Sequence, residues 1–210
     1  MNFLVGNINN FIENIIYNYN EDVEIDATLK NSISNAFEVM FGDSETSTAL
    51  VNSIATLVRN DLDVGDAYYT KTDGEPTLKK FMVNEARLRQ ANESRGRMKN
   101  EIDELLGSLV GIAEECSNIR VTNIDSFSAL MDRLTTERIK RYNFLYKQNK
   151  KAEAAHQEIV IEAVLVKVKE LFIQILNEGG YVFVGEKRTF DESKLIEDVS
   201  QILKNINDYD

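Results

Sequence analysis

Acidic side chains gather in one stretch of the chain at spacings that suit metal binding. Glu101 and Glu104 are three residues apart, so they would share one face of a helix. Glu114 and Glu115 follow about three helical turns later. Carboxylate oxygens are the ligands that magnesium prefers. The cluster therefore raises the hypothesis of a metal site with Glu101 and Glu104 as ligands.

Glu101-x-x-Glu104 resembles the acidic motif of the all-helical nucleotide pyrophosphohydrolases, and this resemblance implies magnesium-dependent hydrolysis of a nucleotide. The pattern of that family also includes Glu-x-x-Asp one or two helices later. The chain has no such pair at a suitable distance. Nucleotide hydrolysis therefore stays an alternative interpretation, and the leading one includes no cofactor and no metal.

Two other reactive patterns point more weakly to chemistry. Glu153-x-x-His156, with Glu158 and Glu162 nearby, resembles half of a carboxylate-bridged di-iron motif. That site needs a second Glu-x-x-His, and His156 is the chain's one histidine, so we expect a solvated helix face here. Cys116 ends an apolar stripe without a nearby histidine, which is typical of an inert buried thiol.

The most distinctive feature is a group of basic residues, named here the basic waist. No acidic residue occurs from position 138 to 152. The waist could bind phosphate or nucleic acid, dock on an acidic protein surface, or be a solvated face balanced by nearby glutamates. Its members are Arg87, Arg89, Arg95, Arg97, Arg138, Lys140, Arg141, Lys147, Lys150 and Lys151.

Charge is unevenly distributed along the 210 residues, whose net charge is −11. Residues 1–66 carry eleven acidic and two basic side chains, whereas residues 84–151 carry ten acidic and thirteen basic ones. Overall acidity argues against general nucleic-acid binding, which needs a dominant basic face. An acidic head in one copy could dock on the basic waist of another, and this favours a homo-oligomer.

The elements that would position these residues are mostly helices, because the chain has one proline and ten glycines. Two long helical stretches, 77–116 and 126–178, are separated by a loop at 117–125, and each is polar in its middle. Folded antiparallel as a coiled-coil hairpin, they bring residue i opposite about 242 − i. Leu78 then faces Val164, and the two polar segments coincide.

Shorter helices precede this hairpin. Apolar residues at three- and four-residue spacing predict a helix over 2–19. Asp26 and Gly42 bound a second helix, and Asp43 or Ser44 caps a third that ends near residue 60. We expect residues 61–76 to form a connector.

The C-terminal segment follows the stop signal Gly179-Gly180. Residues 181–190 predict a β-hairpin around Gly185-Glu186, and Asp191 can cap a final helix. The chain thus divides into an acidic bundle at 1–66, the long hairpin at 77–178, and residues 179–210.

Nothing in the sequence indicates a membrane. The first residues lack a basic region, and the most apolar segment, 159–176, contains several charged side chains. A single cysteine suits a reducing compartment. We therefore expect a cytoplasmic protein without a membrane partner.

Residues 130–140, Leu-Met-Asp-Arg-Leu-Thr-Thr-Glu-Arg-Ile-Lys, resemble a motif of an uncharacterised helical protein family. The motif reads roughly Leu-Ile-Asp-Lys/Arg-Leu-Ser/Thr-x-x-x-Ile-Lys. The aromatic-His pair that often follows it is absent, since Arg141-Tyr142-Asn143 stands there. The resemblance implies a helical fold and no particular activity.

Together these patterns predict an all-α protein built on an elongated helical hairpin, with N-terminal helices and a small β-hairpin before the last helix. The leading interpretation is a non-catalytic structural, adaptor or assembly protein that self-associates or binds a protein partner. A metal-dependent nucleotide hydrolase and a nucleic-acid-binding module that uses the basic waist are the alternatives.

Overall fold

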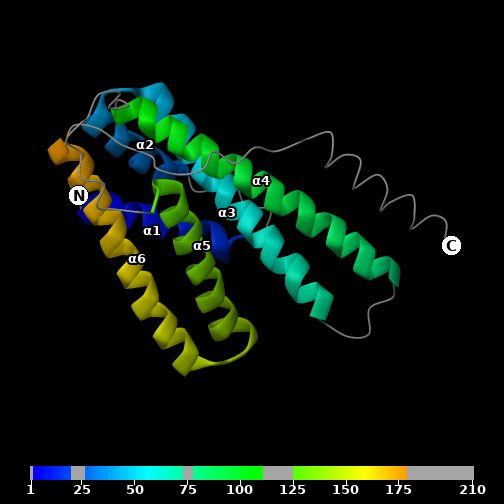
Figure 1. The fold of residues 1–210 in the computed structure, drawn as a ribbon. Helices are drawn as coiled ribbons and strands as arrows, with labels where there is room; N and C mark the ends of the chain where they lie inside the picture. Colours follow the sequence, from blue (N-terminus) through cyan, green and yellow to red (C-terminus); the bar gives the residue numbers. More distant parts are fainter. Residues whose placement is uncertain (1, 20–26, 73–77, 111–124, 179–210) are drawn as a thin grey trace.

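The computed structural model describes residues 2–19, 27–72, 78–110 and 125–178, and helices make up nearly all of them (Figure 1). No strand occurs in these ranges. The predicted β-hairpin at 181–190 and the last helix lie outside them, as do Glu114, Glu115 and Cys116. The helices are α1 Asn2–Tyr17, α2 Ala27–Phe41, α3 Ser44–Thr72, α4 Leu78–Val110, α5 Phe127–Tyr142, the π-helix η1 Asn143–Lys147, and α6 Lys151–Glu178.

The turn between α2 and α3 follows the predicted end and start signals. Gly42 adopts a φ of 82° and donates its N–H to the carbonyl of Glu38 at 2.7 Å. Asp43 then accepts from the backbone N–H of Thr46 at 2.9 Å and from its hydroxyl at 2.8 Å. This side-chain cap starts α3, as expected for Asp43.

The helices pair differently from the prediction. α4 packs most extensively against α3, and α5 against α6, so Figure 1 shows two antiparallel hairpins that diverge from a common body. Hydrogen bonds join Ser53 to Glu101 and Asn60 to Ser94, which sets residue i opposite about 154 − i. The predicted pairing of 77–116 with 126–178 is therefore wrong. It failed because α3 continues to Thr72 instead of ending near residue 60, and so offers α4 a full-length partner.

One hydrophobic core runs through all six α-helices. Three fully buried phenylalanines meet at its centre, Phe37 from α2, Phe127 from α5 and Phe172 from α6. Their ring centroids lie 5.3 to 6.5 Å apart, within the range of favourable edge and tilted contacts. α3 contributes a buried stripe formed by Leu50, Val51, Ile54, Leu57 and Val58.

The stretch 126–178 is two helices rather than one. α5 ends at Tyr142, η1 follows, and Asn149 takes a positive φ of 52° before α6 begins. The reversal is closed by the N–H of Gln148 and the N–H of Lys150, which donate to the carbonyls of Asn143 and Phe144 at 3.0 and 2.7 Å. Asparagine tolerates this left-handed conformation better than most residues.

Substitution of Asn149 tests this break. Asn149→Ala should lower the free energy of unfolding by about 1 kcal/mol, because a Cβ without a compensating side chain disfavours positive φ, while Asn149→Gly should be neutral or stabilising. Urea unfolding followed by circular dichroism gives both values. A continuous helix predicts the opposite order, with alanine the more stable variant.

Candidate interaction surface

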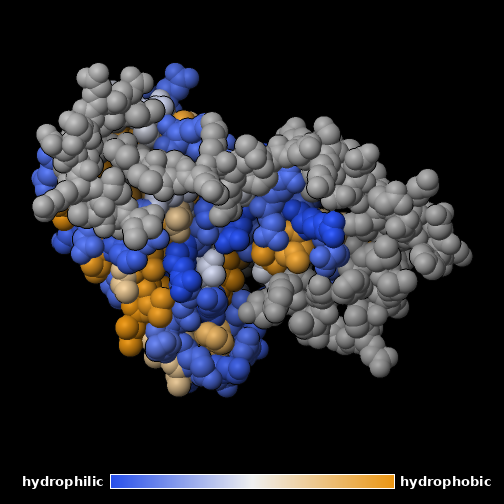
Figure 2. Space-filling model, in the orientation of Figure 1, coloured by the Kyte–Doolittle hydropathy of each residue, from blue (hydrophilic) through white to orange (hydrophobic). Residues whose placement is uncertain are grey.

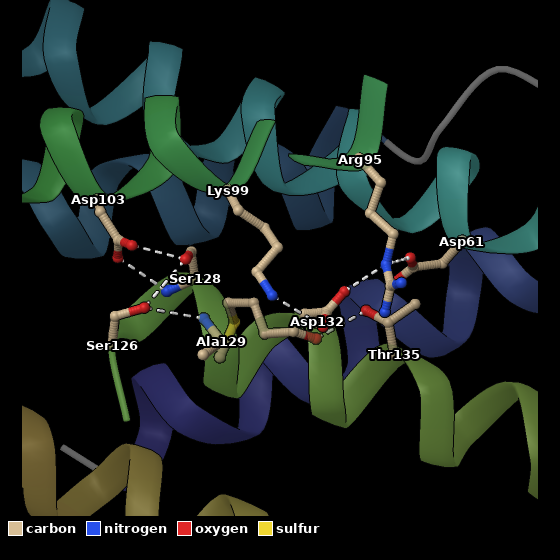
Figure 3. Close-up of polar contacts among 10 residues, drawn as sticks. Asp61, Arg95, Lys99, Asp103, Ser126, Ser128, Ala129, Asp132 and Thr135 are labelled. Atoms are coloured by element: carbon tan, nitrogen blue, oxygen red, sulfur yellow. Dashed lines mark hydrogen bonds and ion pairs between the residues drawn. The ribbon is translucent and has the colours of Figure 1, made fainter. Parts of the chain in front are cut away.

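Part of the basic waist lies inside the protein, where α3, α4 and α5 meet (Figure 3). The Nε of Arg95 lies 2.6 Å from a carboxylate oxygen of Asp61 on α3 and 2.6 Å from one of Asp132 on α5. Lys99, one turn further along α4, reaches the other oxygen of Asp132 at 3.1 Å. Two basic and two acidic side chains therefore bind three helices together.

Asp61 is the most perturbed group of this network. Its side chain is 4% exposed, and Oδ2 is buried without a hydrogen-bond partner among the described residues. Burial, reinforced by the nearby charge of Asp132, raises the pKa of Asp61 to about 8, although Arg95 and Lys99 oppose the shift. The carboxyl therefore stays mostly protonated at neutral pH and reaches its midpoint near pH 8.

A second polar junction fixes the start of α5 against α4. Asp103 of α4 accepts from the backbone N–H of Ser128 at 3.0 Å and from its hydroxyl at 2.6 Å (Figure 3). Ser126 caps the same helix by accepting from the N–H of Ala129 at 3.2 Å. Both contacts satisfy N–H groups that a helix start leaves unpaired.

Arg138 joins the opposite side of α5 to α1 and α6. Its side chain is 5% exposed and contacts Glu13 of α1 at 2.7 Å and Glu158 of α6 at 3.2 Å. The amide oxygen of Asn9 accepts two further hydrogen bonds, at 2.8 and 3.0 Å. Arg141 pairs with the same Glu158 and donates to the hydroxyl of Tyr17. These two arginines therefore hold helices together.

The rest of the basic waist is spread over several faces. Lys140 pairs with the buried carboxylate of Glu137, and Arg87 lies 3.9 Å from Asp66. Lys150 lies 6.0 Å from the ring centroid of Phe144. Six members of the waist are exposed, namely Arg87, Arg89, Arg97, Lys147, Lys150 and Lys151. Other members point inward, because α4 directs Arg95 toward α3 and α5 while α5 directs Arg138 toward α1 and α6.

The candidate metal ligands are also dispersed. Glu101 is exposed and accepts a hydrogen bond from Ser53 at 2.7 Å. His156 and Glu153 are exposed on α6, whereas Glu158 is engaged by the two arginines. In the described ranges, no three histidine, cysteine, aspartate or glutamate side chains lie close enough to hold a metal ion.

A small cavity lies between α1, α3, α5 and η1. Its volume of about 80 Å³ has room for a few waters. This is well below the roughly 300 Å³ at which pockets for small organic ligands begin. Its walls include Ile16, Tyr19, Leu62, Ile139 and Tyr142.

The outward face of α6 is the exposed feature that sequence reasoning missed. Ile159, Val166 and Ile173 recur every seven residues and are 69%, 53% and 41% exposed. Figure 2 shows hydrophobic side chains gathered over this helix. Ile159 and Leu176 are exposed, because the core takes a different stripe of α6, formed by Ile161, Val164, Val168, Leu171, Phe172 and Ile175. The seven-residue repeat was the available signal.

Comparison with protein-family models, curated proteins and solved structures finds no match. Residues 130–140, which carry the motif resemblance, lie within α5. None of the helices, over the residues described, combines the length and apolar character needed to cross a membrane.

The titration of Asp61 should give folding stability a distinct pH dependence. Between about pH 4 and 8 the folded state retains a proton that the unfolded state has lost, so the free energy of unfolding falls as pH rises, by at most about 1.4 kcal/mol per pH unit. Asp61→Asn should remove most of this fall. Urea unfolding from pH 4.5 to 8 measures the slope.

Asp43→Asn is the matched control, and it should leave the pH dependence of the unfolding free energy unchanged. Hydrogen bonds from Thr46 hold the pKa of Asp43 below its ordinary value, so this carboxyl is ionised in both states throughout the window. Equal slopes for wild type and Asp61→Asn would refute the assignment to Asp61.

Removal of Arg138 should be far more damaging than removal of an exposed cation. Arg138→Ala leaves Glu13, Glu158 and Asn9 without their shared partner, and should cost about 3 kcal/mol in unfolding free energy. Lys167→Ala breaks an exposed pair with Asp125 and should cost less than about 1 kcal/mol. Similar losses in chemical denaturation would show that the Arg138 network is not a structural junction.

Proposed function

We propose that this protein is a non-catalytic assembly protein that self-associates through the outward face of α6. The observation that carries the proposal is the position of Ile159, Val166 and Ile173 on the side of α6 opposite the core. A surface helix with one buried stripe does not need a second apolar stripe for its own fold. Contiguous exposed apolar side chains are typical of interaction sites.

The charges around this stripe favour a second copy of the chain as its occupant. Glu162, Lys169 and Glu170 flank it, whereas Lys167 lies further round the helix and pairs with Asp125. The face therefore carries both signs of charge and is not basic. Nucleic acid or an anionic membrane would attract a basic face instead. A face with both signs of charge can pair with itself, as a two-fold contact requires.

The other interpretations have less support. Nucleic-acid binding through the basic waist would have to rely on its six exposed cations, because Arg95 and Arg138 are committed to partly buried ion pairs within the protein. The same ion pairs also weaken the hypothesis that residues 1–66 of one copy dock on the basic waist of another, because these two arginines already contact carboxylates of their own chain. Nucleotide hydrolysis has no supporting cluster of carboxylates within the ranges that the structure covers.

Placing a charge at the centre of the stripe tests self-association. The wild-type protein should be a dimer by light scattering at micromolar concentration. Val166→Glu should be a monomer, with a dissociation constant raised at least about 100-fold, because two carboxylates would be buried at the contact.

Val39→Glu is the matched control, because it introduces the same charge at a valine that is 86% exposed on α2. It should leave the dimer intact, and circular dichroism should show that both variants are folded. A wild-type monomer at 100-fold higher concentration, or a dimeric Val166→Glu, would overturn the proposal.

A further inference from the structure

We infer that two copies pair their α6 helices antiparallel, with Val166 on the two-fold axis. This inference rests on the proposed self-association and adds the orientation and register of the contact. It follows from two properties of the exposed face: the spacing of its large side chains and the gradient of side-chain size along the helix. The side of the stripe on which each charge lies then sets which ion pairs form.

The spacing sets the register. At 100° per residue, Ile159, Val166 and Ile173 fall within an arc of about 40° and span about 21 Å along the helix. Val166 lies midway between the two isoleucines in the sequence. An antiparallel partner therefore brings residue i opposite about 332 − i. Ile159 then packs against Ile173 of the second copy on both sides of a central Val166 pair.

The gradient of side-chain size favours the antiparallel direction. The N-terminal part of the stripe carries the small, exposed Ala152 and Ala155, whereas Leu176, 51% exposed, lies at its C-terminal end. An antiparallel partner places the small Ala155 close to the large Leu176 at both ends of the contact, so the distance between the two helix axes stays similar along its length. A parallel partner stacks alanine on alanine and leaves a gap at that end, which forfeits packing contacts.

The charges meet different partners in the two directions. Glu162 and Lys169 lie on the same side of the stripe, and antiparallel helices bring like sides together. Each Glu162 then meets Lys169 of the second copy, and Glu170 lies beside Ala163. In a parallel dimer Lys169 would meet Glu170 instead, and Glu162 would lie beside Ala163. Both directions form two ion pairs, so the charges identify which pairs an experiment should reverse rather than which direction is preferred.

Disulfide trapping in the intact chain tests the orientation, with the single native cysteine removed by Cys116→Ser. Ile159→Cys and Ile173→Cys proteins should each resist cross-linking alone but should form a disulfide-linked dimer when mixed, because the antiparallel register brings only these two positions together. Val166→Cys should link to itself. Val39→Cys, exposed on another helix, should not.

Each result of this trapping supports or overturns one part of the inference. Efficient linking of Ile159→Cys with itself would mean parallel helices, and would overturn the orientation while self-association stands. A dimeric mass without linking at any α6 position would place the contact elsewhere. A monomeric mass would remove the proposed function itself.

Charge reversal gives an independent readout that does not depend on cysteine geometry. Glu162→Lys and Lys169→Glu should each raise the dimer dissociation constant roughly tenfold, and the double variant should restore it, because the opposite charges meet again. In a parallel dimer the double variant would stay weak, since position 169 would still face Glu170 with a like charge.

Discussion

The structure depends on the requirement that an ionised side chain placed between helices must meet an opposite charge. This requirement is concentrated on α5, the helix of the second hairpin that contacts both α3 and α4 of the first (Figure 1). On one side Asp132 receives Arg95 and Lys99 from α4, and on the other Arg138 reaches α1 and α6. The ion pairs fix how α5 is rotated and shifted, while the phenylalanine centre packs it against α2 and α6. Removing one partner leaves the other charged and poorly solvated, so the pairs disfavour any other arrangement of these helices.

This internal use of charge has a consequence for function. In the chain's most basic segment, Arg138, Lys140 and Arg141 pair with carboxylates of the same chain, whereas Lys147, Lys150 and Lys151 are exposed. The exposed feature that the fold does not account for is apolar instead. α6 buries one stripe in the core and presents a second on the opposite side. A helix with two apolar stripes can pack against the core of its own chain on one side and against a second protein surface on the other. In the proposed dimer, a second copy of the chain provides that surface.

Much of the local structure could be predicted from the sequence. The cap at Asp43, the left-handed Gly42 and the buried stripe from Leu50 to Val58 follow from short-range preferences, because each involves residues within one or two turns. The pairing of the long helices could not be predicted this way. Several helices carry apolar stripes of similar character, so more than one pairing would bury them. The match between the polar middles of 77–116 and 126–178 does not distinguish between these pairings. The connector expected at 61–76 is wrong as well, because α3 continues through Asp61, which is buried against Arg95, as far as Thr72.

The sequence by itself determined that the protein is helical, where most of its helices begin, and that it lacks the motifs of familiar reactions. Periodicity and capping chemistry are local properties, so they can be read without knowledge of the fold. Tertiary structure alone decided which charges are internal, how far α3 extends and which of the two stripes of α6 meets solvent. Those outcomes depend on which helices lie side by side. The same arginine stabilises the interior or marks a surface according to whether a carboxylate from a distant part of the chain lies beside it.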